Sequence, residues 1–404
     1  MTTDVGAPRR GCDTVLASAV LLAAFSVAIP VAAWAQDDPY AFEPTVIGSL
    51  DLTMRNDHSY DSEVANKKLS DTYMLGALRL GAFFTPELSA RATITLQPMT
   101  VATTTRWFHN EGAFIEELNL RWEPGDAVFF VGKFDPPFGI ASKEAPGLYG
   151  TEFSGDYLIK EAVGGGATYS LRTDNWGTHS LSAAGFFLDN TPLAQALGSR
   201  PKLGDTYAAR YGRSHSYYGG VGNTQAPQSA ILTVDGGDFP DLPDLRYQIG
   251  ADMLRHDKTG QRDQYGYVAG LRYLPEIDDG IRFGPTLEFA AVENAGGYQI
   301  YAPRSSTAMG QSGRYLTFGL EAHIDNWVMS VVHANRWSLE PADGSGPNGR
   351  SSFDQLQTES VGYVFDSGFG ITVAHKHVRT LDPVSLTAGV IDTIGAQTTY
   401  SLVF

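Results

Sequence analysis

Residue types that support catalysis or metal binding occur together at three places in the sequence. Ser214-His215-Ser216 and His256-Asp257 combine a hydroxyl or a carboxylate with a histidine, as hydrolytic sites do. His375 and His377 are two residues apart, so in a strand they share one face and resemble a metal-binding pair. The sequence offers neither a third ligand at a useful spacing nor a G-x-S-x-G nucleophile elbow. We therefore predict no catalytic residue, no metal and no cofactor, while a hydrolase that uses the Ser/His or Asp/His residues stays open as an alternative.

Charged side chains offer a second kind of chemistry, which is the electrostatic steering of solutes. Alternation along four successive predicted strands places four basic residues inward: Arg79, Arg91, Arg121 and Lys133. Adjacent strands lie about 4.8 Å apart, so these side chains are expected to form one basic wall. The stretch 135–159 follows directly, and its acidic residues outnumber its single lysine, Lys143. These acidic residues are Asp135, Glu144, Glu152 and Asp156.

The elements that must position these residues are strands. Segments of about 10 to 13 residues alternate apolar and polar side chains, which is the two-residue period of a sheet with two different faces. In one such segment Phe283, Leu287 and Phe289 oppose Arg282, Thr286 and Glu288. Sixteen segments are predicted to start near residues 45, 72, 89, 112, 127, 160, 178, 227, 244, 264, 281, 314, 327, 355, 369 and 390.

The connections between these segments alternate between short turns and long loops, as in an outer-membrane barrel. Lipid offers no partners to backbone groups, so only a closed sheet is tolerated there, with an apolar outside and a polar inside. The predicted fold is all-β, a transmembrane antiparallel β-barrel of about 16 strands with short periplasmic turns and long external loops. The rival interpretation is an exported soluble sandwich or propeller.

Two features weigh against a soluble fold. The five tryptophans after residue 36 all lie near predicted strand ends, and barrels carry aromatic girdles at both interfaces. Trp327 and Trp337 are ten residues apart, which at a tilt of about 45° approaches the ~25 Å apolar band. The same parity turns His333 and Asn335 outward, so we expect a bulge or another register there. The terminal Phe404 shares one face with Leu402 and Tyr400, which resembles the last strand of bacterial outer-membrane barrels.

The N-terminus predicts export. Arg9 and Arg10 precede an apolar run from Val15 to Ala33, and Ala33-Trp34-Ala35 provides a small-x-small cleavage site. We expect a signal peptide over 1–35 and the barrel over 36–404. Cleavage would remove the only cysteine, Cys12, so disulfide and thiol chemistry are not expected.

Composition excludes several classes of protein. The chain has 404 residues, a formal net charge of −16 and 18% charged residues. An acidic chain repels phosphate, which argues against nucleic-acid binding. The sequence has 21 Phe, 19 Tyr and 6 Trp, which is too aromatic for a disordered acidic chain.

The stretch Val131-Gly132-Lys133-Phe134-Asp135-Pro136-Pro137-Phe138-Gly139 is similar to a G-x-F-x-P-P-F-G motif of the phosphate-selective porin O/P group and related outer-membrane porins. The barrel pattern covers the mature chain, whereas this motif covers nine residues. The resemblance implies a passive, water-filled channel and a homotrimer. The family's anion-selective members carry rows of lysines, and the mature chain has only eight, so phosphate selectivity is not carried over.

We therefore predict a porin in the outer membrane of a Gram-negative bacterium, through which small polar solutes and ions diffuse passively. General porins fold their third loop inward, so we expect residues 135–159 to oppose the basic wall and form a constriction. The expected partners are outer-membrane lipid, lipopolysaccharide and small polar solutes. The alternatives are a substrate-specific channel and a non-conducting structural or adhesin barrel.

Overall fold

Antiparallel strands are the main regular element of the computed structural model. The structure describes residues 42–197, 221–257, 262–296, 312–339, 352–381 and 388–404, so the predicted cleavage at Ala35 lies outside the described residues. Residues Pro44–Phe404 form one compact unit, distinct from Met1–Glu43. In the described residues, no helix is long and apolar enough to cross a membrane.

Sixteen long strands in the described residues form the barrel wall. They are β1 (Thr45–Ser62), β2 (Ser70–Phe83), β3 (Leu88–Pro98), β5 (Glu111–Trp122), β6 (Ala127–Phe134), β7 (Ala162–Thr173), β8 (Gly177–Leu188), β9 (Ser229–Gly237), β10 (Leu245–Leu254), β11 (Gln264–Tyr273), β13 (Ile281–Glu293), β14 (Ser312–Ile324), β15 (Trp327–Leu339), β16 (Ser352–Val364), β17 (Phe369–Leu381) and β18 (Ala388–Val403). Two short strands, β4 (Arg106–Trp107) and β12 (Glu276–Asp278), lie in connections.

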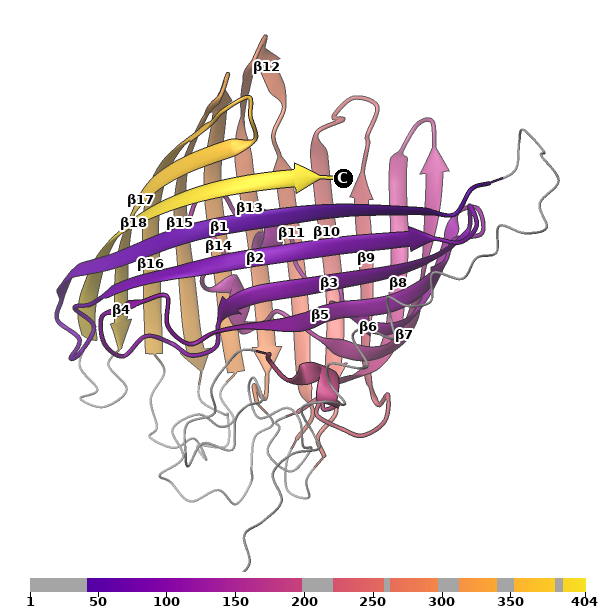
Figure 1. Ribbon diagram of the computed structural model, residues 1–404, viewed down its shortest axis with the longest axis horizontal. Helices are drawn as coiled ribbons and strands as arrows, with labels where there is room; N and C mark the ends of the chain where they lie inside the picture. The colour runs from indigo at the N-terminus through magenta and orange to yellow at the C-terminus, as the bar shows by residue number, and fades with distance from the viewer. Residues whose placement is uncertain (1–41, 198–220, 258–261, 297–311, 340–351, 382–387) are drawn as a thin grey trace, which may run out of the picture. The chain divides into compact units, whose positions relative to one another are not determined.

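The wall closes on itself. Each long strand pairs antiparallel with its neighbours in the chain, and β18 pairs with β1 from Ser49–Val403 to Ser62–Ile391. Figure 1 shows the strands following one another around the wall, with the yellow β18 beside the indigo β1. The predicted closed antiparallel barrel is confirmed, and each predicted strand start lies within three residues of the observed one.

On β13 and β14, apolar side chains point outward and polar side chains point inward at neighbouring positions. Outward side chains such as Leu287, Phe289 and Phe318 remain 44%, 46% and 41% exposed. Their strand neighbours Thr286, Glu288 and Thr317 point inward and are buried. A two-residue period dictates this division, because successive side chains in a strand leave opposite faces of the sheet.

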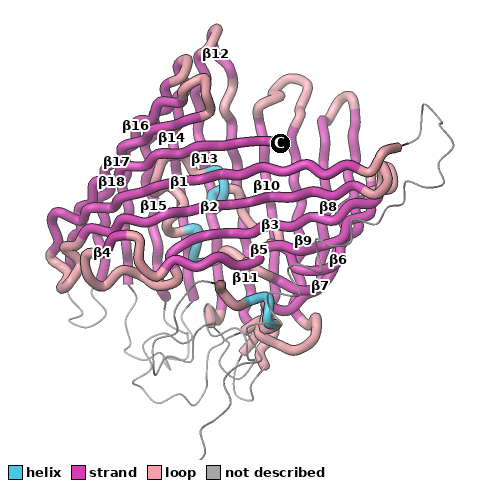
Figure 2. The backbone as a smooth tube through the Cα atoms, viewed as in Figure 1, coloured by secondary structure: helices cyan, strands magenta, loops and turns pink. Residues whose placement is uncertain are grey.

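Side chains of the connection between β6 and β7 fill part of the barrel interior. It contains α2 (Ala141–Glu144) and the 3-10 turn η1 (Ser154–Asp156), while η2 (Pro192–Ala194) follows β8. Figure 2 shows these short helices in cyan; the rest of the described backbone is strand and loop. Phe138, Phe153 and Tyr157 of this connection belong to one buried apolar cluster with inward residues of the wall, including Val268, Ala290 and Leu356.

Candidate functional site: a segment folded into the barrel

Residues 135–161 leave β6, cross the interior to the opposite wall and return to β7; we call them the folded-in segment. Its firmest attachment is the inward carboxylate of Glu288 on β13, which is 1% exposed. The backbone amide of Ala141 donates to Glu288 Oε2 at 3.0 Å, and the amide of Ile140 donates to the same oxygen. The Tyr157 hydroxyl donates to Oε1 at 2.5 Å. One buried carboxylate therefore holds both the outgoing and the returning part of the segment.

The middle of the segment is bound to β1. The Tyr149 hydroxyl donates to Asp57 Oδ1 at 2.6 Å, and Arg55 Nη1 donates to the carbonyl oxygen of Leu148 at 3.2 Å. The Arg55 guanidinium also lies 4.6 Å from the centroid of the Tyr149 ring, which adds a cation–π contact. Hydrogen bonds and aromatic packing thus fix the segment at the junction where the barrel closes.

Acidic side chains of the segment are paired with basic residues of the wall it lies against. Glu152 accepts from Lys376 on β17 at 2.8 Å, and Asp156 lies 2.8 Å from Arg336 on β15. Glu144 lies 2.8 Å from Arg246 on β10 and 3.3 Å from Arg272 on β11. Moving the segment away from this wall would separate the three carboxylates from their partners, and leaving a charge without its partner inside the barrel is unfavourable.

Two glycines allow the segment to approach the wall closely. Gly139 has φ +86°, and a Cβ there would lie 2.8 Å from Glu288 Oε1. Gly147 has φ +78°, and a Cβ there would meet the hydroxyl oxygens of Ser330 and Ser360, which hydrogen-bond to each other at 2.7 Å. Both positions combine a left-handed backbone with contact, so any other residue would displace the segment.

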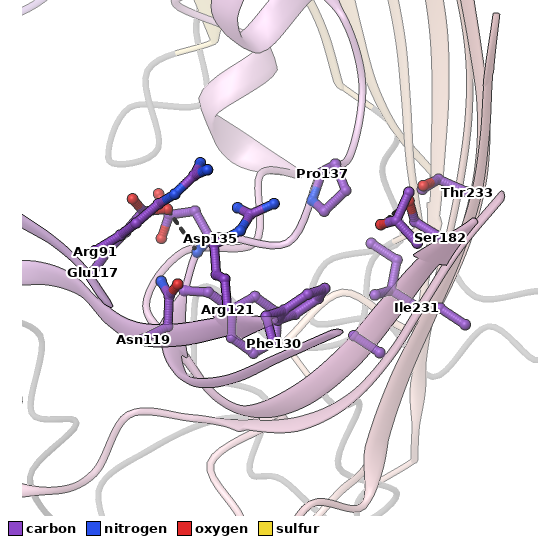
Figure 3. Close-up of a pocket in the computed structure, with 14 residues that line it drawn as sticks. Arg91, Glu117, Asn119, Arg121, Phe130, Asp135, Pro137, Ser182, Ile231 and Thr233 are labelled. Carbon is purple, nitrogen blue, oxygen red and sulfur yellow. Dashed lines mark hydrogen bonds between the residues drawn. The ribbon is translucent and has the colours of Figure 1, made fainter. Parts of the chain in front are cut away.

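Between the start of the segment and the wall from β3 to β9 lies a cavity of about 310 Å³. Arg91, Asn119 and Arg121 line it on one side, together with Asp135 and Pro137 of the segment. Figure 3 shows both guanidinium groups on the side of Asp135, with Ser182, Ile231 and Thr233 on the facing strands.

The two cavity arginines share one carboxylate outside the segment. Arg91 lies 3.1 Å and Arg121 3.2 Å from the same oxygen, Glu123 Oε1. The trio therefore carries one excess positive charge. Arg79 does not line this cavity, and its side chain pairs with Asp51 on β1.

The prediction that Lys133 belongs to the basic wall is wrong. Lys133 pairs in register with Leu118, which is 40% exposed on the outside, and directly opposed residues in an antiparallel pair point to the same side. Its side chain is 1% exposed, and Nζ lies 3.0 Å from Glu161 and 2.6 Å from Asp189. Lys133 is thus a buried cation on the outward side of the sheet, where it pairs with Glu161 and Asp189.

The predicted opposition between the acidic stretch and the basic wall is also wrong for three of its four carboxylates. Glu144, Glu152 and Asp156 bind basic residues on the far wall, not Arg79, Arg91 or Arg121. Of the predicted acidic residues, Asp135 alone shares the cavity with Arg91 and Arg121. The partners on the far wall, Arg246, Arg272, Arg336 and Lys376, were missed; their inward parity was the available signal.

The carboxyl of Asp135 has a pKa that is displaced toward neutrality. Burial is the main reason why the pKa of this carboxyl is raised to about 7. The nearby Glu116 carboxylate also raises the pKa, and the hydrogen bond from the amide of Glu161 at 2.7 Å lowers it. Because the folded pKa exceeds the ordinary 3.8, folding stability contributed by this group falls as pH rises from about 4 to about 7. As the pH rises through about 7, the Asp135 carboxyl loses its proton and the cavity gains a negative charge.

We expect this charge to be measurable as pH-dependent ion selectivity. Between pH 6 and pH 8 the reversal potential in a salt gradient should move toward cation preference, and Asp135→Asn should abolish the step around pH 7. Planar-bilayer recordings of both proteins in the same buffers provide the measurement. A step of equal size in Asp135→Asn would assign the titration to another group.

The candidate catalytic and metal-binding residues do not form a site in the described residues. His256 Nδ1 lies 2.5 Å from Asp263, and the Ser214-His215-Ser216 stretch lies outside the described residues. His375 and His377 lie near Glu359 and Asp392, at 3.2 Å and 2.8 Å respectively. Within the described parts of the chain, no three His, Cys, Asp or Glu side chains converge as metal ligands.

Comparison with known proteins supports the fold. Neither a protein-family model nor a curated protein matches the sequence. The structure is similar to the outer membrane channel DcaP of Acinetobacter baumannii, with a TM-score of 0.54 and 10% identity over 89% of this chain and 97% of that one. It is also similar to OmpT, an outer membrane protein of Vibrio cholerae, with a TM-score of 0.50 and 12% identity over 91% of this chain and 100% of that one. A loop L8 deletion mutant of OmpT gives a TM-score of 0.52 at 11% identity, over 89% and 99% of the two chains. The chain therefore has the fold of outer-membrane β-barrels.

Proposed function

We propose that this protein is an outer-membrane channel for the passive diffusion of small polar solutes and ions. The observation that carries the proposal is the folded-in segment, which is fastened to the wall from β10 to β1 and leaves a polar cavity beside Arg91 and Arg121. The likeness to DcaP, described as an outer membrane channel, supports the same interpretation.

Charge inside the barrel favours polar over apolar solutes. Arg91 and Arg121 line the same cavity as Asp135. Charged groups of this kind set up a local field, and such a field orders water and admits solutes with matching dipoles. Charged groups are tolerated there because the interior is hydrated, whereas placing them in lipid would cost free energy. The segment then acts as the constriction.

The further assignments complete the proposal. Export through a cleaved signal peptide over 1–35 would deliver the chain to the outer membrane, where lipid and lipopolysaccharide would surround it. The motif at 131–139 supports kinship with the phosphate-selective porin O/P group, without its lysine rows. The role is that of a channel and not of an enzyme, and the channel assembles as a trimer.

Unit conductance is the first test. Purified protein inserted into a planar bilayer is expected to give discrete, ohmic current steps. A folded protein without steps would favour a non-conducting structural barrel, and current that one solute blocks saturably would favour a substrate-specific channel.

Ion selectivity tests the constriction. In Arg91→Glu/Arg121→Glu the cavity charge changes by four units in the negative direction. Four unit charges at about 7 Å in water, partly screened by salt, amount to roughly 1–2 kcal/mol, so the cation-to-anion permeability ratio should rise roughly tenfold. Arg91→Lys/Arg121→Lys keeps the charge and should retain the wild-type reversal potential. An unchanged reversal potential in the glutamate variant would remove these arginines from the conduction path.

A further inference from the structure

The outward face of the barrel changes character between β14 and β15. One register row contains Leu271, Leu287 and Phe318, which are 40%, 44% and 41% exposed. The same row continues through His333, Gln357 and His377 on β15, β16 and β17. Residues directly opposed in antiparallel strands point to the same side, so these three polar side chains face outward as the three apolar ones do. The strands pair here without a bulge, so the expected bulge or change of register at His333 and Asn335 is wrong.

Two aromatic pairs mark the two ends of the outward face on β15 and β16. Trp327 lies 4.9 Å from Tyr363 at one end, and Trp337 lies 5.4 Å from Phe353 at the other, measured between ring centroids. The two tryptophans are ten residues apart, which corresponds to about 33 Å along the strand, or about 23 Å at a 45° tilt, and this matches the apolar thickness of a barrel. The polar residues between the pairs thus fall within the band where lipid-facing side chains are apolar.

The matching positions on β13 and β14 show the contrast. Their outward residues over the same rows are apolar: Pro285, Leu287, Phe289, Leu316, Phe318 and Leu320. On β15 to β17 the outward residues of these rows are mostly polar. We call the following set the polar face: His333, Asn335, Gln355, Gln357, Glu359, His375 and His377.

Side chains of the polar face contact one another, yet stay open to the outside. Glu359 lies 3.2 Å from His375, and His333 Nε2 lies 3.0 Å from Asn335 Nδ2. The side chains of Glu359, His375 and His377 nevertheless remain 55%, 42% and 40% exposed. Lipid cannot satisfy the remaining donors and acceptors, and charged groups on the lipid face of a barrel are destabilising according to their depth.

We propose that the polar face is covered by a second copy of this chain. The face carries carboxylate, amide and imidazole groups together, so copies related by a rotation axis can pair the acceptors of one with the donors of the other. A face of one charge sign would instead repel its copy. This inference rests on the proposed location in the outer membrane, and it assigns the assembly surface to β15–β17.

Replacing three of the seven residues of the polar face with leucine tests the occupant. Glu359→Leu/His375→Leu/His377→Leu suits lipid, so in mild detergent it is expected to elute as a monomer with intact β-structure, whereas the wild type elutes as an oligomer. The control Leu271→Ala/Leu287→Ala alters the outward face on β11 and β13 and should leave the oligomer intact. An oligomeric triple variant would overturn the proposal. A monomeric wild type would also overturn the proposal. If the triple variant were then more stable than this monomeric wild type, lipid would be what covers the face.

Cross-linking gives a second measurement in native outer membranes. The sequence has one cysteine, so in a Cys12→Ser background Gln357→Cys reports on the polar face and Leu271→Cys on the apolar side. A short bismaleimide is expected to produce covalent dimers of Gln357→Cys only. Dimers of neither or of both variants would contradict the proposal. Conductance steps from a monomeric protein would contradict the assembly proposal but not the channel function. Cross-linked oligomers without conductance would contradict the channel function but not the assembly proposal.

Discussion

Glu288→Leu is expected to detach the folded-in segment and to produce a larger, noisier conductance. Glu288 accepts hydrogen bonds from the amides of Ile140 and Ala141 and from the hydroxyl of Tyr157. Leucine has a similar volume but accepts none of them, so three donors in a buried environment lose their partner. Each unsatisfied buried donor costs about 1–3 kcal/mol, so the loss of all three hydrogen bonds weakens the attachment of the segment by roughly 3–9 kcal/mol.

Two controls separate release of the segment from damage to the barrel. Tyr157→Phe removes one donor and leaves the carboxylate bound to both amides, so its conductance should stay near the wild-type value. Retained resistance to unfolding in gel electrophoresis would show that the Glu288→Leu wall is closed. Wild-type conductance and noise in a folded Glu288→Leu barrel would mean that the segment does not limit the current.

The strand pattern was predictable because lipid and water impose opposite demands on alternate residues. On β13 the sequence alone separates Phe283, Leu287 and Phe289 from Arg282 and Glu288, and the structure places the two sets on opposite faces. The short strands β4 and β12 were not predicted, because two or three residues carry no period. At His333 and Asn335 the alternation gave the right face, and only the assumption of lipid on every side suggested an irregularity.

The contacts of the site could be predicted only in part, because they join residues far apart in the chain. A polar residue at an inward position can be recognised, but nothing local to Glu288 reveals that Ile140 and Tyr157 will bind it. Asp156 and Arg336 are 180 residues apart. Which wall the segment lies against depends on closure of the whole barrel, so the sequence supplied the charged residues of the segment without their partners.

Lys133→Met is expected to destabilise the barrel while leaving its ion selectivity unchanged. The Lys133 ammonium lies between Glu161 and Asp189, whose side chains are 2% and 0% exposed. Methionine fills a similar volume without a charge, so both carboxylates remain buried without their cation. Removing one partner from a buried charge cluster costs about 3–5 kcal/mol, which should lower the midpoint of urea unfolding markedly.

A compensated variant identifies the cause of that loss. Lys133→Met/Glu161→Gln/Asp189→Asn removes all three charges, so it should recover part of the stability that Lys133→Met loses. Neither variant should shift the reversal potential in a salt gradient, because Lys133 lies beyond the interior face. Unchanged unfolding with a shifted reversal potential would return Lys133 to the pore wall. A loss of stability with unchanged selectivity would show that Lys133 of the 131–139 motif has a structural role. It would fix the end of β6, where the folded-in segment begins.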